Sequence, residues 1–227
     1  PDHSFAAEYF GGDKGEYDSL KHNRTSVLNP EAPDGSDLNS LPSYDGMFSL
    51  ARSGLADNNT YLQLQQQLDI DNFIDYMIVN IWAGNTDWAH QNWYASRRQA
   101  PDGRWRYHSW DAEHVMESSG ANVTGKNDSN GPSELYYRLR TQNAEFRMRF
   151  ADHVHRHFFN GGVFYVDPSN PVYNPAFPER NRPAAIWMER IGKIMDGPIV
   201  AESARWGDTG QTGTVRADNP LTRNREF

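Results

Sequence analysis

Two aspartates and an asparagine lie within the stretch Asn80–Glu113 at spacings that could serve phosphoryl transfer. Asp87 is followed five positions later by Asn92, and Asp111 stands two positions before Glu113. In such chemistry one carboxylate orients the attacking hydroxyl, while an amide oxygen and a second carboxylate hold magnesium ions on the phosphates. The Asp-x-x-x-x-Asn spacing is that of a protein-kinase catalytic loop, but both residue types are common in loops, so the spacing needs support from its surroundings.

The segment before Asp87 supplies part of that support. Apolar residues recur at three- and four-residue spacing through Ile70–Trp82, which predicts a helix that is buried on most sides. Asp69 or Asp71 is suited to cap its start, and Gly84 can end it in a left-handed conformation. The predicted helix therefore leads the chain directly into the loop that carries Asp87.

The segment that begins at Asn92 predicts a β-hairpin. Residues 92–98 and 104–110 are rich in tryptophan and tyrosine, which favour strands, and a polar turn with proline and glycine separates them. Metal and catalytic sites need rigidly packed surroundings, and we expect most of the tryptophans of this region to pack around the base of the hairpin and provide them. They are Trp82, Trp88, Trp93, Trp105 and Trp110.

Asp111 follows the second aromatic strand, where a carboxylate would be partly desolvated and would stay charged only if it were paired or bound to metal. If the strand continues, Asp111 and Glu113 point to one face and form a divalent-metal pair. The alternative is that both carboxylates form ion pairs with arginines of the hairpin, Arg97, Arg104 or Arg106.

Composition excludes several other functions. The chain has 227 residues, 37% of them hydrophobic, and a net charge of −8, which argues against nucleic-acid binding. It has no cysteine, so thiol catalysis, cysteine-based zinc sites and disulfides are excluded. No apolar run approaches the roughly 20 residues that a membrane span needs. The chain begins at Pro1, which we interpret as the start of a slice of a longer protein.

Elsewhere the pattern is mostly helical. Residues 143–159 and 183–194 predict helices, whereas residues 29–45, rich in Pro, Asp, Ser and Gly, predict a loop. We therefore predict an α+β fold that is mostly helical, with the hairpin as its clearest sheet element.

Several short segments together resemble the spore-coat protein H (CotH) kinase family. The resemblance covers roughly half of the chain by motif and is specific in combination. It is carried by Glu8–Asp18, Asp71–Tyr76, Asn85–Trp88 with Asn92 and Tyr94, Trp105–Tyr107 and Trp110–Glu113.

This resemblance implies an atypical protein kinase, secreted or located at the cell or spore surface, that uses ATP with Mg²⁺ or Mn²⁺ to phosphorylate Ser or Thr of a protein substrate. By position, Asp87 matches the catalytic aspartate, while Asn92 and Asp111 match metal ligands. Glu113 stands where many members carry an aspartate, and we include it among the expected metal ligands. The implied fold is the C-terminal lobe of a kinase-like domain, with the hairpin at the active site and the N-terminal lobe largely missing.

The implied kinase-like domain covers residues 1–206. Residues 1–60 are expected to be a remnant of the first lobe with connecting loops, 61–206 the C-terminal lobe, and 207–227 a polar tail. The nucleotide-binding lysine and glycine loop are expected upstream of Pro1, so we assign no nucleotide-binding residue and expect residues 1–227 alone to be inactive.

Two other functions remain open. One is a metal-dependent phosphoesterase that uses Asp87, Asp111 and Glu113, and the other is a non-catalytic surface or adhesion module with a kinase-like fold. His153, His155 and His157 resemble a metal cluster. On a helix, however, only the first and last of these histidines share a face, and we interpret them as a helix surface.

Overall fold

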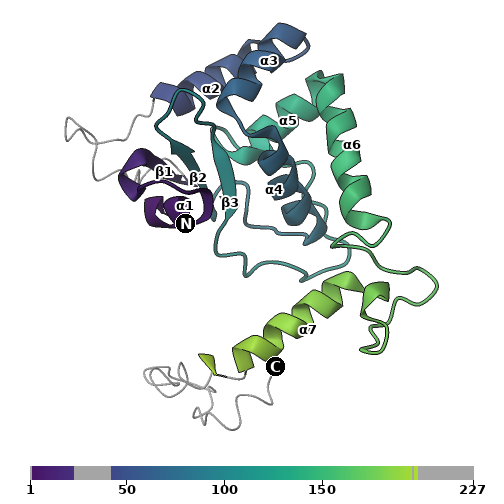
Figure 1. Cartoon of the computed structure of the whole chain (residues 1–227). Coiled ribbons are helices and arrows are strands. Elements are labelled where there is room, and N and C mark those ends of the chain that lie inside the picture. Colours follow the sequence, from purple (N-terminus) through teal and green to yellow (C-terminus); the bar gives the residue numbers. More distant parts are fainter. Residues whose placement is uncertain (1, 23–41, 196, 199–227) are drawn as a thin grey trace, which may run out of the picture. The chain divides into compact units, whose positions relative to one another are not determined.

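The computed structural model describes residues 2–22, 42–195 and 197–198. Within them the chain forms seven α-helices and one three-stranded antiparallel sheet, which confirms the α+β prediction (Figure 1). It divides into two compact units, Pro1–His153 and Val154–Phe227. The predicted tail, residues 207–227, and most of the predicted loop at 29–45 lie outside the described residues.

The sheet carries the predicted hairpin and one strand that we did not predict. Its order is β1 (Tyr17–Lys21), β2 (Trp93–Arg98) and β3 (Arg106–Ser109). β1 pairs with β2 so that Lys21 lies opposite Tyr94. The N-terminal segment therefore reaches the strand that begins directly after Asn92 (Figure 1).

The helices of the first unit lie around this sheet and the core (Figure 1). They are α1 (His3–Phe10), α2 (Pro42–Ser53), α3 (Asn58–Gln67), α4 (Ile70–Trp82), α5 (Pro132–Gln142) and α6 (Ala144–Phe158), with a short 3₁₀ turn, η1 (Lys14–Glu16). α2 begins inside the predicted loop, which is therefore wrong for residues 42–45. The proline at its first position suits a helix start, because the amide hydrogen that proline lacks would have no partner there.

α4 confirms the predicted buried helix. Asp69 caps it by accepting a hydrogen bond from the backbone N–H of Asn72 at 3.2 Å. Gly84 follows its C-terminal end with a φ of 58°, a left-handed conformation that glycine adopts without a steric penalty. α4 packs against β3, so the helix and the hairpin form one rigid support for the loop between them.

Three of the five tryptophans form the centre of this support. Trp88, Trp93 and Trp105 are buried, whereas Trp82 and Trp110 are 37% and 43% exposed. The expectation that most of these rings are packed is therefore met by three of the five, and Trp82 and Trp110 are the exceptions.

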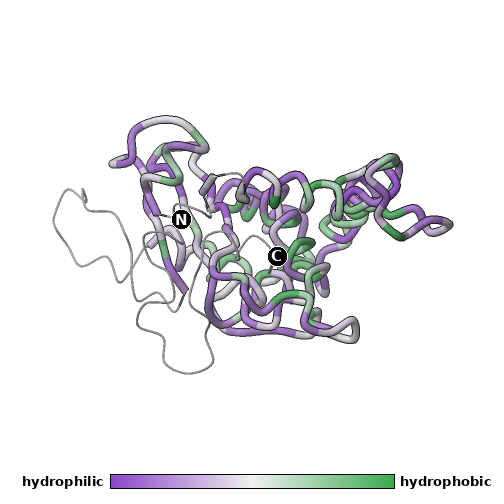
Figure 2. Tube along the Cα trace, turned by 90° about the horizontal axis from the view of Figure 1, so that it is seen from below, coloured by the Kyte–Doolittle hydropathy of each residue, from purple (hydrophilic) through white to green (hydrophobic). Residues whose placement is uncertain are grey.

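The second unit contains the C-terminal end of α6, then η3 (Pro178–Arg180) and α7 (Arg182–Met195). An isolated bridge joins Val166 and Asn181. None of the described helices of the chain is long and apolar enough to cross a membrane. Figure 2 shows the same pattern, with hydrophobic stretches interrupted by hydrophilic residues.

One buried carboxylate ties α5 to α2. The side chain of Glu134 is only 5% exposed and accepts hydrogen bonds from Arg52 at 2.7 and 2.8 Å and from Arg138 at 2.8 Å. It also accepts the backbone N–H of Asn130 at 2.8 Å. Burial opposes ionisation of Glu134, but these hydrogen bonds and the positive charge of Arg52 outweigh it and lower the pKa of the carboxyl from 4.5 to about 2.

We predict that Glu134→Gln lowers the free energy of unfolding in a pH-dependent way. Because the pKa of Glu134 is depressed in the folded state, its contribution is complete above pH 4.5 and declines as the pH falls toward 2. The shift corresponds to roughly 3 kcal/mol, and since Arg52 is 39% exposed, solvent screening reduces the expected difference at pH 7 to about 2 kcal/mol.

Urea unfolding of wild type and variant between pH 3 and 7 measures this difference. Glu16→Gln is the matched control, because Glu16 pairs with Arg98 at the surface and should change stability little at any pH. If the difference in unfolding free energy between wild type and Glu134→Gln stayed constant over this pH range, the lowered pKa of Glu134 would be contradicted.

Candidate active site at the Asp87 loop

A relay of buried asparagines fixes the backbone of the Asp87 loop. Asn80, in the last turn of α4, donates a hydrogen bond to the carbonyl of Tyr76 at 2.8 Å and accepts one from the side chain of Asn85 at 2.9 Å. The other end of the Asn85 amide accepts the backbone N–H of Asp87 at 3.0 Å. Asn80 and Asn85 are each 2% exposed. Our sequence analysis assigned neither of them a role. The sequence marked them only as polar residues in or beside an apolar helix.

The carboxylate of Asp87 is held by side chains of its own loop. The amide nitrogen of Gln91 lies 2.7 and 2.6 Å from its two oxygens, and that of Asn92 lies 2.8 Å from one of them. Nε2 of His90 lies 3.3 Å from the other oxygen. The Asp87 side chain is 13% exposed, so it is largely covered but reachable. The predicted pair of Asp87 and Asn92 is in direct contact, and Gln91 and His90 are additions that the sequence did not indicate.

Asn92 connects the loop to both neighbouring strands. Its amide nitrogen also donates to the main-chain oxygen of Asp111 at 3.2 Å, and its backbone N–H donates to Nδ1 of His22 at 3.1 Å. Burial and then the positive charge of Lys21 lower the pKa of His22, while the charge of Asp87 opposes this shift. A neutral His22 ring can accept the hydrogen bond, so the end of β1 helps to position Asn92.

Asp111 differs from our expectation. β3 ends at Ser109, and Asp111 is exposed with a φ of 50°. Its carboxylate is therefore not desolvated at the end of a strand, and no continuing strand aligns it with Glu113. Of the hairpin arginines, Arg106 pairs with Asp69 at 2.9 Å.

The group that comes together around Asp87 contains Glu113 and His114 rather than the Asp111 carboxylate. One ligand atom from each of Asp87, Glu113 and His114 lies within 4.8 Å of the others. Main-chain hydrogen bonds hold this segment to the loop, from Thr86 N–H to the His114 carbonyl at 3.1 Å and from Met116 N–H to the Ala83 carbonyl at 2.7 Å. His114 was missed because it carries no motif and approaches Asp87 only through the fold.

The donor set suits a divalent cation. Mg²⁺ binds oxygen ligands at about 2.0–2.1 Å, so two of its ligands are at most about 4.2 Å apart, which a group of ligand atoms within 4.8 Å of one another can reach with small movements. Carboxylates suit Mg²⁺ and Mn²⁺, and an imidazole is a ligand for softer transition metals. The hydrogen bond from Nδ1 of His114 to the carboxylate of Glu117, at 2.7 Å, raises the pKa of His114, so a metal would compete with a proton for this ring. Asn92 directs its amide nitrogen to Asp87 and Asp111, and its amide oxygen is the atom that suits a metal.

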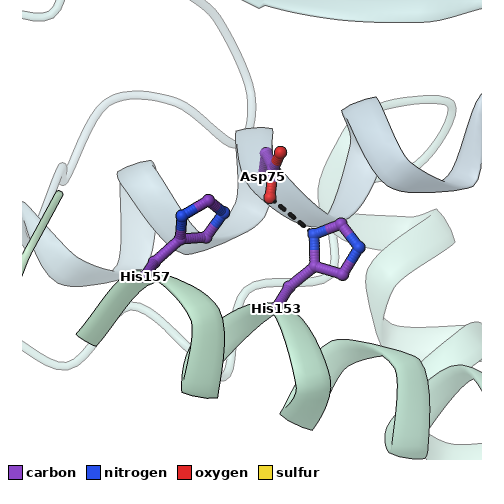
Figure 3. Close-up of side chains that lie close together, drawn as sticks. All are labelled: Asp75, His153 and His157. Carbon is purple, nitrogen blue, oxygen red and sulfur yellow. Dashed lines mark hydrogen bonds and ion pairs between the residues drawn. The ribbon is translucent and has the colours of Figure 1, made fainter. Parts of the chain in front are cut away.

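A second cluster lies between α4 and α6. His153 is 3% exposed, and its two ring nitrogens lie 2.7 Å from Asp75 and 3.0 Å from Asp71 (Figure 3 shows the bond to Asp75). Arg149 also binds Asp71, through two hydrogen bonds of 2.8 and 2.7 Å, and lowers its pKa. The interpretation of this histidine as helix surface is therefore wrong. His153 binds the helix that precedes the Asp87 loop, and the signal for it was the Asp71–Asp75 pair one turn apart on α4.

Comparison with known proteins places this site in a family. The model of the CotH kinase protein family matches residues 13–157, which include Asp87, Asn92, Asp111 and Glu113. No curated protein and no solved structure matches the chain. Because the match covers more than half of the chain and contains the whole candidate site, the protein belongs to the CotH kinase family.

Proposed function

We propose that this chain is the catalytic-loop part of an atypical protein kinase that transfers the γ-phosphoryl group of ATP to Ser or Thr of a protein. The observation that carries the proposal is the carboxylate of Asp87, held by Asn92 at kinase spacing and fixed through Asn85 to a buried helix. Phosphoryl transfer depends mostly on positioning and electrostatics, and a carboxylate restrained in this way meets the first requirement.

In the proposed reaction the acceptor hydroxyl oxygen forms a bond to the γ-phosphorus, and the bond from that phosphorus to the bridging oxygen breaks, so ADP leaves with the electron pair. Asp87 orients the hydroxyl and accepts its proton. Gln91 and Asn92 restrain the carboxylate, and at least one of its oxygens has to turn toward the hydroxyl.

For the metal site, we propose Asn92, Asp111 and Glu113, and the geometry adds His114 as a fourth candidate. A bound divalent cation would neutralise the charge that develops on the phosphates. Asp111 is exposed and in contact with Asn92 through its main chain, so its carboxylate is free to rotate toward a cation.

The family is linked to the spore coat, which favours a place at the cell or spore surface and a protein acceptor there.

A metal-dependent phosphoesterase is the second candidate function. The observation in its favour is the imidazole of His114 beside two carboxylates, because a cation with mixed nitrogen and oxygen ligands can generate a hydroxide nucleophile. Hydrolysis of a simple phosphate ester without a preference for nucleotides would select this alternative.

We predict that Asp87→Asn lowers the rate of phosphate transfer by roughly 10²–10⁴-fold, the usual contribution of a general base. The amide keeps the shape of the side chain but cannot accept the proton, so nucleotide affinity should change little. Incorporation of radiolabelled phosphate into dephosphorylated casein, with nucleotide titration in parallel, measures both quantities in the full-length protein. The control is Asp102→Asn in the exposed hairpin turn, which should behave as wild type. Undiminished transfer by Asp87→Asn would remove Asp87 from the mechanism.

We also predict that Glu113→Gln weakens Mn²⁺ binding by at least about 10-fold, the lower end for losing even an outer partner of a metal ligand. The change removes one negative charge from the cluster of Asp87, Glu113 and His114. Titration of Mn²⁺ followed by electron paramagnetic resonance measures the free ion directly. Glu145→Gln in the exposed first turn of α6 is the control. Equal Mn²⁺ affinity in wild type, Glu113→Gln and His114→Ala would place the metal elsewhere.

A further inference from the structure

A small polar pocket lies next to the Asp87 loop. It is lined on one side by Ala89, His90 and Trp93 and on the other by residues 128–131, and its volume is about 220 Å³. Pockets for drug-sized ligands occupy roughly 300–1,000 Å³, so a nucleotide is too large for it. One water takes about 30 Å³ of liquid volume, so the pocket holds more than a single water. Its size fits a short piece of polypeptide.

Three polar atoms of residues that line the pocket lie around Gly131, and one of them, the carbonyl oxygen of Asp128, already accepts the Gly131 N–H at 3.3 Å. A Cβ added to Gly131 would lie 2.9 Å from the carbonyl oxygen of Ala89, 3.5 Å from that of Asp128 and 3.6 Å from Nε1 of Trp93. Trp93 is 2% exposed, and among the described residues its indole N–H has no hydrogen-bond partner. A buried donor without a partner is unfavourable, so this N–H requires an acceptor from a ligand or from water.

The chemistry of the wall selects the class of ligand. Two carbonyl oxygens accept hydrogen bonds and the indole donates one, so a complementary group must offer both a donor and an acceptor. A peptide group does so with its N–H and its C=O. The lining contains no lysine or arginine, which a phosphate group would need for charge compensation.

The pocket also lies beside the proposed catalytic carboxylate. His90 lines the pocket, and its Nε2 lies 3.3 Å from the carboxylate of Asp87. A polypeptide with one peptide group in the pocket would therefore present a neighbouring side chain close to Asp87.

We propose that this pocket binds a main-chain peptide group of the acceptor protein, next to the residue whose hydroxyl receives the phosphate. The proposal rests on the proposed kinase function for the identity of its ligand. The peptide C=O accepts the Trp93 indole N–H, and the peptide N–H donates to the carbonyl of Ala89 or Asp128.

The indole N–H of Trp93 is itself the probe for the test. Its ¹H–¹⁵N resonance is identified by its loss in Trp93→Phe and followed during titration with acetyl-Gly-Ser-Gly-amide. We expect this resonance to move downfield as the N–H gains an acceptor, and serinol, which has hydroxyls but no peptide group, to leave it unchanged. No movement at saturating peptide would overturn the proposal, because the pocket then holds solvent only. Movement with serinol or with Mg-ATP in place of the peptide would equally overturn it.

Two variants and their controls test the pocket separately. Gly131 has a φ of −116°, which alanine adopts readily. The added Cβ would lie 2.9 Å from the backbone oxygen of Ala89, so Gly131→Ala fills this side of the pocket and also displaces its wall. Its control is Gly125→Ala, where an added Cβ meets nothing within 4 Å. Trp93→Phe removes the donor and keeps a ring. Trp105→Phe is its control because Trp105 is buried outside the pocket and its Nε1 likewise has no hydrogen-bond partner within the described part of the chain.

We expect Gly131→Ala and Trp93→Phe each to weaken peptide binding by about 10-fold or more, as for the loss of a hydrogen bond at a buried site, and the controls to bind as wild type. Calorimetric titration with the same peptide measures all four variants, and their melting curves show that each is folded. Wild-type affinity in a folded Gly131→Ala and a folded Trp93→Phe would contradict the proposal.

Transfer to dephosphorylated casein separates this inference from the proposed function. If both hold, Gly131→Ala raises the KM for casein and leaves nucleotide affinity unchanged. Peptide binding without any transfer by wild type would reject the kinase function and retain the pocket. Transfer by wild type with an unchanged KM in Gly131→Ala would reject the pocket and retain the kinase function.

Discussion

A carboxylate that acts on a reacting hydroxyl must be held still and yet remain reachable, and the structure around Asp87 meets this constraint. The chain of contacts begins in the core, where α4 is buried on most sides. It then passes through Asn80 and Asn85 to the backbone of Asp87. Breaking a buried amide hydrogen bond costs free energy, because the freed donor and acceptor have no water to bind. The relay therefore resists distortion. The side chain of Asp87 is held by residues of its own loop, which can rearrange when a substrate arrives.

Two residues proposed to act on phosphate or metal are also the ones that turn the chain. Asn92 and Asp111 have φ values of 56° and 50°. Asparagine and aspartate tolerate this left-handed region better than other residues with a side chain. At each of these positions the residue type therefore suits the backbone conformation and also carries a side-chain oxygen of the kind that a divalent cation prefers. The hydrogen bonds of Asn92 to Asp87, Asp111 and His22 keep both turns in contact.

Ionisable side chains in the first unit separate into two kinds. Glu134 and His153 are buried and fully surrounded by partners, and they join α5 to α2 and α6 to α4. Asp111 and Glu113 are exposed at the edge of the site. A buried polar or charged group is tolerated only when it has hydrogen-bonding partners, so the first kind holds the scaffold together. An exposed carboxylate keeps its hydration until a cation replaces the water, which is what a metal ligand requires.

Much of the scaffold could be predicted from the sequence because its signals are local. The period of apolar residues in α4, the cap at Asp69, the glycine after the helix and the aromatic strands each depend on neighbours a few positions away. The spacing of Asp87 and Asn92 within one loop is of the same kind, and their contact follows from it. The contributions of β1, His22, His114, His153 and Gly131 could not be predicted in this way. Each depends on partners far along the chain, such as Asn92 for His22 and Asp75 for His153. Whether Trp110 and Asp111 are buried or exposed depends in turn on where β3 ends. Local propensity therefore determined the elements that carry the site and the contact of Asp87 with Asn92. Only the packing of distant segments decided that Glu113 and His114 lie near Asp87, because such contacts leave no periodic trace in the sequence.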